Sequence, residues 1–288
     1  MKSYSFRSVV LYCLFTAAVT VVAGYAFGKL VYTPWQISKL QAQSDLRDPA
    51  TLKASREAGE RIAARRTEKL GPEKQKELQM LWHELGIWGN LYYMGIRIQK
   101  NPMDLYMMQQ LIFDVRPDYI IEAGTAYGGS AIYWAHMLEG MGLDDSKVLT
   151  VDITRYEEEA EKLPLWKKHV EFFLGSSTDP AIVEKIRQRV AGKKVLVVLD
   201  SNHAAAHVFD ELTAYAPMVS KDSYIVVEDT NLDALPLPDL KYVEGNGGGP
   251  MAAVNKYLAG EGAGKFEQDL LRENFVLTFN PGGWLKRK

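Results

Sequence analysis

Three acidic residues follow apolar, β-type runs of this 288-residue chain, at the points where the expected strands end. The run VLVVLD ends at Asp200, and the run YIVVED ends at Glu228 and Asp229. If the two strands are neighbours in one parallel sheet, their carboxyl ends share an edge and the carboxylates converge there. Clustered carboxylates repel one another unless a divalent cation relieves the repulsion, and hard oxygen ligands suit Mg²⁺, with Mn²⁺ as an alternative. The sequence therefore predicts a metal site at these acids, although each acid alone also fits a helix cap or a surface charge.

Two histidines follow the first of these acids. His203 lies three residues after Asp200 in the segment DSNH, and His207 comes one helical turn later. Because imidazole titrates near neutral pH, His203 is a candidate general base for a hydroxyl held beside the metal. Asp200, His203 and His207 also fit the two-histidine, one-carboxylate pattern of an Fe(II) oxygenase. A purely structural role for either histidine is the third interpretation.

A glycine-rich turn lies earlier in the chain, in Tyr119–Ser130, which reads YIIEAGTAYGGS. Glycines let the backbone approach a ligand closely, and a helix start presents free N–H groups, so this pattern is typical of a nucleotide-binding turn. The spacing is neither G-x-G-x-x-G nor that of a phosphate-binding loop ending in G-K-[ST]. An ordinary turn between a strand and a helix is the alternative. The candidate cofactor-binding residues here are Glu122, Gly124, Thr125, Gly128, Gly129 and Ser130.

Polar residues also end the next two expected strands. Asp152 ends KVLTVD, where an acid can accept hydrogen bonds from the hydroxyls of a ribose. Ser176 follows the next strand and is placed to contact the adenine side of a nucleotide. Asp152 and Ser177 are alternatively helix caps. Asp152, Ser176 and Asp200 complete the candidate cofactor-binding residues.

β-type runs and helical patterns alternate from about residue 104 onward, with Asp104 as the expected cap of the first helix. This alternation predicts a parallel sheet with helices on both faces. The last two runs are close in sequence and predict an antiparallel hairpin around Asn280–Gly283. The predicted strands are 119–122, 147–152, 170–174, 195–200, 223–228, 275–279 and 284–286, and the predicted helices of this region are 105–113, 130–138, 179–190, 204–215 and 251–258.

The region before these elements divides into two parts. Ser8–Gly28 contains no charged residue, and its length matches the roughly 20 residues needed to cross a bilayer. We interpret 8–28 as an uncleaved single-pass membrane anchor, with a cleaved signal peptide as the alternative. Residues 35–100 are interpreted as a polar helical stalk, with a lid or a dimerisation element as the alternative, and 101–288 as the functional domain.

The composition excludes several classes of protein. A net charge of −2 lacks the basic excess of a nucleic-acid-binding protein. The single cysteine, Cys13, allows neither an intrachain disulfide framework nor a cysteine-based zinc site. The sequence does not determine the oligomeric state, and a homo-oligomer is compatible with it.

The form E-x-G-T-x-x-G-G-S resembles motif I of class I S-adenosylmethionine (SAM) methyltransferases. More broadly, about 102–286 resembles the cephalosporin hydroxylase/rhamnosyl O-methyltransferase family, through DLYMMQQLIFDVRPDYIIEAGTAYGGSAIYWA, KVLTVDI, VLDSNHAAAHVFDELTAYAPMVSKDSYIVVEDT, GPMAAVNKYL and FEQDLLRENFVLTFNPGGWLKR. The resemblance implies a class I methyltransferase (Rossmann-like) fold and SAM as the methyl donor. It also implies Mg²⁺ held by Asp200, Glu228 and Asp229, with His203 as the base. The family does not usually carry the predicted membrane span and stalk, which leaves the acceptor open.

Together these features predict a membrane-anchored, Mg²⁺-dependent O-methyltransferase. The expected acceptor is a small molecule or glycolipid, most simply a sugar hydroxyl, because an anchor would hold the domain beside lipid-linked substrates. The catalytic domain is expected to face the cytosol, where SAM is made. The alternatives are a non-catalytic, membrane-tethered scaffold of the same fold and the Fe(II) oxygenase that uses Asp200, His203 and His207.

Overall fold

The computed structural model describes residues 48–236, 247–275 and 277–288. The chain divides into two units, Met1–Ala58 and Gly59–Lys288, and all residues discussed below as a site belong to the second unit. The predicted limits of the stalk and of the functional domain stay predictions.

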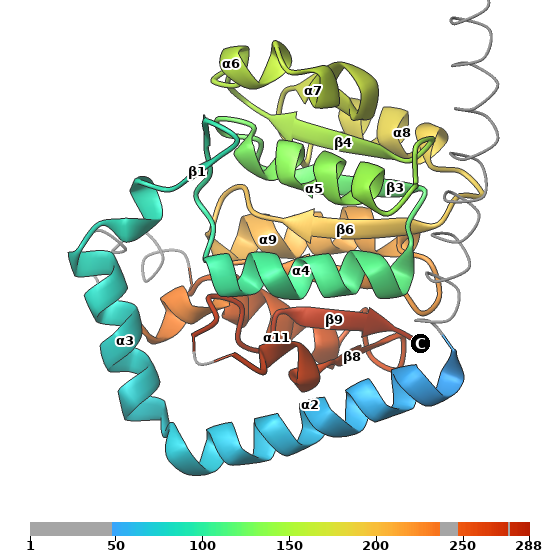
Figure 1. The fold of residues 1–288 in the computed structure, drawn as a ribbon. Coiled ribbons are helices and arrows are strands. Elements are labelled where there is room, and N and C mark those ends of the chain that lie inside the picture. Colours follow the sequence, from blue (N-terminus) through green and yellow to red (C-terminus); the bar gives the residue numbers. More distant parts are fainter. Residues whose placement is uncertain (1–47, 237–246, 276) are drawn as a thin grey trace, which may run out of the picture. The chain divides into compact units, whose positions relative to one another are not determined.

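The described elements are mostly short helices and strands in alternation (Figure 1). The helices are α2 (Pro49–Lys69), α3 (Pro72–Glu84), α4 (Pro102–Val115), α5 (Gly129–Gly140), α6 (Glu158–Glu161), α7 (Pro164–His169), α8 (Pro180–Arg189), α9 (Ala205–Tyr215) and α11 (Pro250–Ala259). The strands are β1 (Tyr92–Tyr93), β2 (Ile96–Arg97), β3 (Tyr119–Ala123), β4 (Lys147–Asp152), β5 (Val170–Leu174), β6 (Val195–Leu199), β7 (Tyr224–Val227), β8 (Phe266–Gln268) and β9 (Trp284–Arg287).

A seven-stranded sheet organises the domain, with the strand order β5-β4-β3-β6-β7-β9-β8. The first five strands of this order pair in parallel, as the alternation of strands and helices predicted. The order reverses direction between β3 and β6, so the loops after these strands diverge and leave a crevice at their carboxyl ends. This crevice is where an open α/β sheet binds its ligand.

Apolar residues of the central strands alternate between two cores, one on each face of the sheet. Ile121 and Val197 pack with residues of α8, α9 and α11, whereas Ile120 and Leu196 pack with residues of α4 and α5. Figure 1 shows α4 and α5 covering one face and α9 and α11 the other. Because β3 and β6 are covered on both faces, nearly all of their residues are apolar, with the buried Glu122 of β3 as the exception.

The C-terminal hairpin differs from its prediction in one strand. β9 pairs antiparallel with β7 and β8, so the antiparallel end of the sheet is confirmed, but β8 is Phe266–Gln268 rather than 275–279. Side chains of other elements bind the backbone of the expected strand instead. Asn101 Nδ2 donates to the Leu277 carbonyl, and Gln79 Nε2 donates to that of Thr278.

The predicted localisation was wrong. Across 48–236, 247–275 and 277–288, no helix combines the length and the apolar character needed to cross a membrane. The longest of these, α2, is rich in charged residues (PATLKASREAGERIAARRTEK). The span expected at Ser8–Gly28 lies outside the described residues.

Candidate functional site

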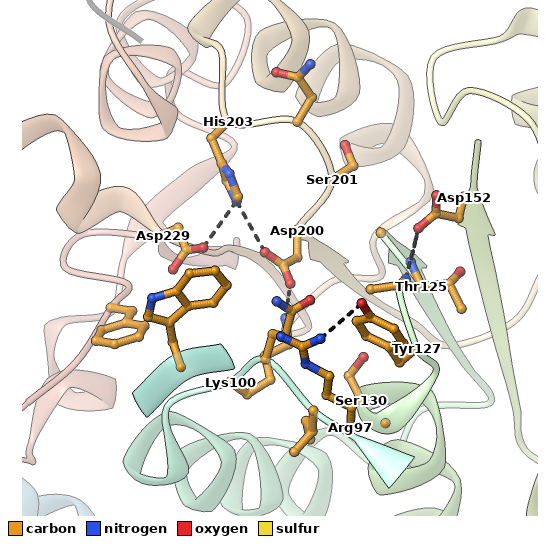
Figure 2. A pocket seen from close by; sticks show the side chains of 18 of the residues that line it. Arg97, Lys100, Thr125, Tyr127, Ser130, Asp152, Asp200, Ser201, His203 and Asp229 are labelled. Atoms are coloured by element: carbon orange, nitrogen blue, oxygen red, sulfur yellow. Dashed lines mark hydrogen bonds and ion pairs between the residues drawn. The ribbon is translucent and has the colours of Figure 1, made fainter. Parts of the chain in front are cut away.

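A cavity of about 1280 Å³ opens at the carboxyl ends of the parallel strands. It receives residues from the loops after β3, β4, β5, β6 and β7, so that strand ends far apart in sequence meet there (Figure 2). Predicted site residues that line it are Gly124, Thr125, Gly129, Ser130, Asp152, Ser176, Asp200, His203 and Asp229. Glu122, Gly128 and Glu228 are not among the lining residues.

Two glycines of the turn after β3 lie against neighbouring backbone. A β-carbon on Gly124, whose φ is +96°, would come 1.9 Å from the Asp200 carbonyl oxygen. A β-carbon on Gly129 would come 2.3 Å from the carbonyl oxygen of Arg97. Side chains at these positions would push the turn away from β6 and β2, so the glycines fix the cavity wall as well as leaving room for a ligand.

Asp152 ties this turn to the end of β4. Its Oδ2 accepts hydrogen bonds from the backbone N–H groups of Thr125 at 3.0 Å and Ala126 at 2.9 Å. Its Oδ1 accepts one from the Thr154 N–H at 3.1 Å. Since a carboxylate offers about four acceptor positions, Asp152 can hold the turn and still accept a hydroxyl of a ligand in the cavity.

Glu122 is fully buried beneath the turn rather than exposed to the cavity. Trp134 Nε1 and Thr150 Oγ1 each donate to its carboxylate at 2.7 Å. Burial raises the pKa of Glu122, although Lys100 and these hydrogen bonds oppose that effect. The contacts indicate that Glu122 joins β3 to β4 and α5 below the glycine-rich turn.

Asp200, His203 and Asp229 meet on the wall of the cavity that faces this turn (Figure 2). His203 Nε2 lies 3.1 Å from Asp229 Oδ2 and 3.4 Å from Asp200 Oδ1. Asp229 holds a left-handed backbone conformation, with φ +57°, and its N–H donates to Asn280 Oδ1 at 2.9 Å. A constrained backbone of this kind is common where a side chain must be aimed at a site.

A lysine that the sequence analysis did not identify lies beside this group. Lys100 Nζ donates to Asp200 Oδ2 and, at 2.6 Å, to Glu228 Oε2, and only 5% of its side chain is exposed. Glu228 is therefore turned toward Lys100, while Asp200 contacts Lys100 through one oxygen and His203 through the other.

The charges of these groups are strongly coupled. Burial alone would lower the pKa of Lys100, but Asp200 and Glu228 outweigh it and hold that pKa far above its usual value. Burial would likewise raise the pKa of Asp200, but Lys100 and His203 bring it below its usual value. The pKa of His203 lies well above its usual value because Asp200 and Asp229 outweigh the effect of burial. Glu228 behaves differently, because burial, together with the nearby Asp200 and Asp229, raises its pKa to about 8 in spite of Lys100.

His207 belongs to a different network. Its Nε2 lies 3.1 Å from Ser177 Oγ and 3.4 Å from Glu211 Oε1, and Glu211 is fully buried. Among the described residues, the ligand group on this wall contains Asp200, His203 and Asp229, without His207. The structure therefore does not bring together the three ligands that the oxygenase alternative requires.

Arg97 also lines the cavity and was not predicted as a site residue. Its Nη1 donates to the Tyr127 hydroxyl at 3.0 Å, and its guanidinium lies 4.7 Å from the centre of that ring. Arg97 ends β2 and Lys100 lies in the segment between β2 and α4, and neither stretch carries a recognisable motif. The one available signal is the pair Asn101-Pro102, which starts α4 and brings the preceding residues to this edge of the sheet.

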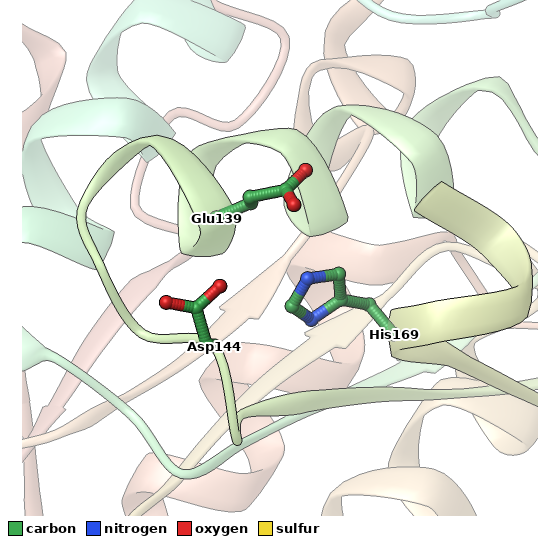
Figure 3. Close-up of side chains that lie close together, drawn as sticks. All are labelled: Glu139, Asp144 and His169. Atoms are coloured by element: carbon green, nitrogen blue, oxygen red, sulfur yellow. The ribbon is translucent and has the colours of Figure 1, made fainter. Parts of the chain in front are cut away.

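The residues on the wall fit a divalent cation. Ligand atoms of Asp200, His203 and Asp229 lie within 4.8 Å of one another, and both acids offer hard oxygen donors. The ligand atoms of Glu139, Asp144 and His169 are equally close (Figure 3). In that second group Lys168 Nζ already binds both acids, at 2.8 Å and 2.6 Å, and the group lies outside the cavity.

Comparison with known proteins gives concordant matches. The family model described as Rhamnosyl O-methyltransferase/CmcI matches residues 86–288. The chain is 37% identical to the rhamnosyl O-methyltransferase of Mycobacterium tuberculosis (strain ATCC 25618 / H37Rv) over 207 residues, 70% of this chain and 80% of the relative. It is 34% identical to the enzyme of the same name from Mycobacterium leprae (strain TN) over 208 residues, 70% of this chain and 85% of the relative.

Among solved structures, two of CmcI share the fold. One, named as a complex with Mg and SAM, has a TM-score of 0.52 and 18% identity, and the match covers 69% of this chain and 77% of that chain. An apo structure has a TM-score of 0.50 and 19% identity, with 69% and 76% covered. These likenesses concern the arrangement of the sheet and its helices.

Proposed function

The chain belongs to the rhamnosyl O-methyltransferase/CmcI family and is a SAM-dependent O-methyltransferase, and from this premise we propose that it methylates a sugar hydroxyl with the help of a divalent cation. The predicted class I methyltransferase fold, with its mostly parallel Rossmann-like sheet, is confirmed. The scaffold alternative, which assumed no catalysis, is not carried forward.

SAM is proposed to lie over the glycine turn, from Gly124 to Ser130. Asp152 would accept hydrogen bonds from the ribose through the acceptor positions that the Thr125, Ala126 and Thr154 N–H groups leave free. Ser176 lines the cavity after β5, which supports a contact with the adenine side. The free N–H groups at the start of α5, together with Arg97, offer positive charge to the carboxylate of the methionine portion.

The divalent cation is proposed to bind at Asp200 and Asp229, with Glu228 as a third acid within the same cluster. When bound, such an ion lowers the pKa of a neighbouring hydroxyl and stabilises the negative charge that forms on its oxygen. The donor set of two facing carboxylates beside His203 supports Mg²⁺, with Mn²⁺ as the alternative.

His203 is proposed to take the proton of the acceptor hydroxyl. Its Nε2 faces the two acids, so they hold the ring at the cavity wall and stabilise the imidazolium that forms. These acids also raise the pKa of His203, and a cation that shared their charge would return that pKa toward the range in which histidine acts as a base. The remaining contribution is orientation of the acceptor oxygen in line with the methyl group.

A sugar acceptor is supported by the relatives and by the cavity. Relatives at 34–37% identity are named rhamnosyl O-methyltransferases, which makes a deoxysugar the first acceptor to examine. Small-molecule sites usually enclose roughly 300–1000 Å³. The volume of about 1280 Å³ found here is larger, which supports binding of cofactor and acceptor together. The glycolipid expectation depended on the membrane anchor and loses its support with it.

The observation that carries this proposal is the meeting of Asp200, His203 and Asp229 in the same cavity as the glycine turn. The test is transfer of a deuterated methyl group from SAM by the full chain to a panel of an alkyl rhamnoside, an alkyl glucoside and a catechol, read by mass spectrometry. We expect label on a hydroxyl of the rhamnoside. Label on the catechol with none on either sugar would contradict the proposed acceptor class.

A further inference from the structure

Lys100 is a buried cation inside an acidic cluster. Its ammonium donates to Asp200 Oδ2 and to Glu228 Oε2, and 5%, 17% and 8% of the three side chains are exposed. Asp200 presents its other oxygen to His203, on the cavity side. Lys100 therefore lies at the cavity wall and binds two of the carboxylates that a divalent cation would use.

The backbone around Lys100 is firmly held. Asn101, which is 2% exposed, caps α4 by accepting a hydrogen bond from the Met103 N–H at 3.1 Å, and its Nδ2 donates to Asp104 and to the Leu277 carbonyl. This anchoring leaves the Lys100 ammonium little freedom to leave the acids. A divalent cation entering from the cavity would therefore meet carboxylates that are already partly neutralised.

Coulomb's law gives this arrangement two consequences. Without a metal ion, Lys100 offsets the repulsion between Asp200 and Glu228, which would be strong for buried carboxylates. With a metal ion nearby, the ammonium repels it and competes with it for the same oxygens. Lys100 thus holds the acids of the site together and at the same time lowers their affinity for the ion.

We propose that Lys100 is a built-in counter-ion that keeps the acids of the metal site assembled in the metal-free enzyme and competes with the divalent cation for Asp200 and Glu228. Lys100 is then a positioning residue that sets the affinity for the ion, rather than a group that touches the substrate. This inference rests on the cation site of the proposed function.

A purely structural ion pair makes the opposite prediction. If Lys100 only held the fold together, its loss would disorder Asp200 and Glu228 and would weaken metal binding. Competition instead predicts that a neutral side chain at position 100 strengthens metal binding. A gain of affinity on removing a buried contact is the signature that separates the two.

The experiment measures Mn²⁺ binding to the full chain by electron paramagnetic resonance, with Mg²⁺ binding by calorimetry alongside. Lys100→Met is expected to bind Mn²⁺ at least about tenfold more tightly than the wild type, because one adjacent positive charge is removed. Lys100→Arg keeps the charge and should stay within about threefold of the wild type. Lys162→Met, at an exposed lysine paired with Glu159, is the matched control and should change nothing.

Glu228→Gln provides the second arm. The gain from Lys100→Met should largely disappear in the Lys100→Met/Glu228→Gln double variant, because the carboxylate that was freed for the ion is no longer present. Lys100→Gln is measured in parallel because Lys100→Met removes the ammonium from both Asp200 and Glu228 without replacing its hydrogen bonds. Adding Mn²⁺ should raise the melting temperature of both neutral variants more than that of the wild type.

The outcomes separate the inference from the proposed function. If the wild type binds Mn²⁺ and Asp229→Asn abolishes that binding, but Lys100→Met binds no more tightly, the inference alone is overturned. If both neutral variants fail to fold even with Mn²⁺ present, the ion cannot replace Lys100 and the inference is overturned as well. If neither the wild type nor the neutral variants bind Mn²⁺, the cation site itself is wrong.

Discussion

The backbone of Gly124 lies directly against that of Asp200. A β-carbon on Gly124 would come 1.9 Å from the Asp200 carbonyl oxygen, and the Asp200 N–H donates to the Ala123 carbonyl at 2.8 Å. The turn assigned to the cofactor and the acid assigned to the cation thus share one rigid contact between β3 and β6. In the proposed function, this contact would hold the methyl donor in place relative to the acceptor oxygen.

Gly124→Ala should therefore weaken SAM binding and lower the stability of the fold. The added methyl group clashes with the Asp200 carbonyl, and φ +96° is strained for alanine, so we expect SAM affinity to fall at least about tenfold. Calorimetry with SAM and thermal melting measure the two effects. Gly140→Ala, where a β-carbon meets nothing within 4 Å, is the control. SAM binding by Gly124→Ala at wild-type strength would refute the close contact.

Asp152→Ala should weaken SAM binding by about 10- to 100-fold, because it removes the proposed ribose acceptor and frees the Thr125 and Ala126 N–H groups of the turn. Calorimetry on the full chain gives the affinity. Asp179→Ala is the matched control, since Asp179 also accepts a backbone hydrogen bond, from Ala181, but caps α8 away from the cavity. Equal SAM affinities for the two variants would contradict the assignment of Asp152.

His203→Gln should lower kcat by about 10²- to 10⁴-fold, the usual contribution of a general base, while leaving SAM affinity nearly unchanged. The separation of kcat from SAM affinity distinguishes a base from a residue that shapes the cofactor site. His136→Gln, at a histidine that contacts Tyr93, serves as the control. A His203→Gln enzyme with wild-type kcat would require another group to accept the proton.

Asp104 should make stability fall as the pH rises. Burial raises its pKa to about 7 in the folded protein, whereas an unfolded aspartate titrates near pH 3.9. Between these pH values the folded state binds more protons than the unfolded state. The free energy of unfolding therefore falls as the pH rises, and the fall is complete above about pH 7. We expect the difference in melting temperature between pH 4.5 and 8 to shrink by about 5 °C or more in Asp104→Asn. Asp145→Asn, at an exposed aspartate, should leave the difference unchanged.

The sequence was sufficient to predict the parallel sheet and the polar residues at its strand ends that line the cavity. Strands covered on both faces are mostly apolar, so VLVVL of β6 and YIVV of β7 stood out, and the acids that follow these parallel strands had to lie at one edge. The same reasoning located Asp152 at the end of β4. These assignments needed only local pattern and the rule that parallel strands end together.

Other features depend on contacts that no local pattern reveals. Lys100 reaches Asp200 and Glu228 from a segment at least 100 residues away, and a single lysine carries no signal of such a partner. The expected strand at 275–279 had a suitable apolar sequence, yet Asn101 and Gln79 bind its carbonyls. Asp104 likewise does not cap α4: Asn101 does, and Asp104 Oδ2 accepts from the Phe279 N–H at 2.8 Å.

The most direct test of the account is the rate of methyl transfer from SAM to a rhamnoside before and after removal of divalent cations with a chelator. We predict that chelation reduces the rate at least about 100-fold, that added Mg²⁺ restores it in the wild type, and that Mg²⁺ fails to restore it in Asp229→Asn. The same rate in the chelated wild-type enzyme, or full restoration by Mg²⁺ in Asp229→Asn, would contradict a cation held by Asp200 and Asp229 beside His203.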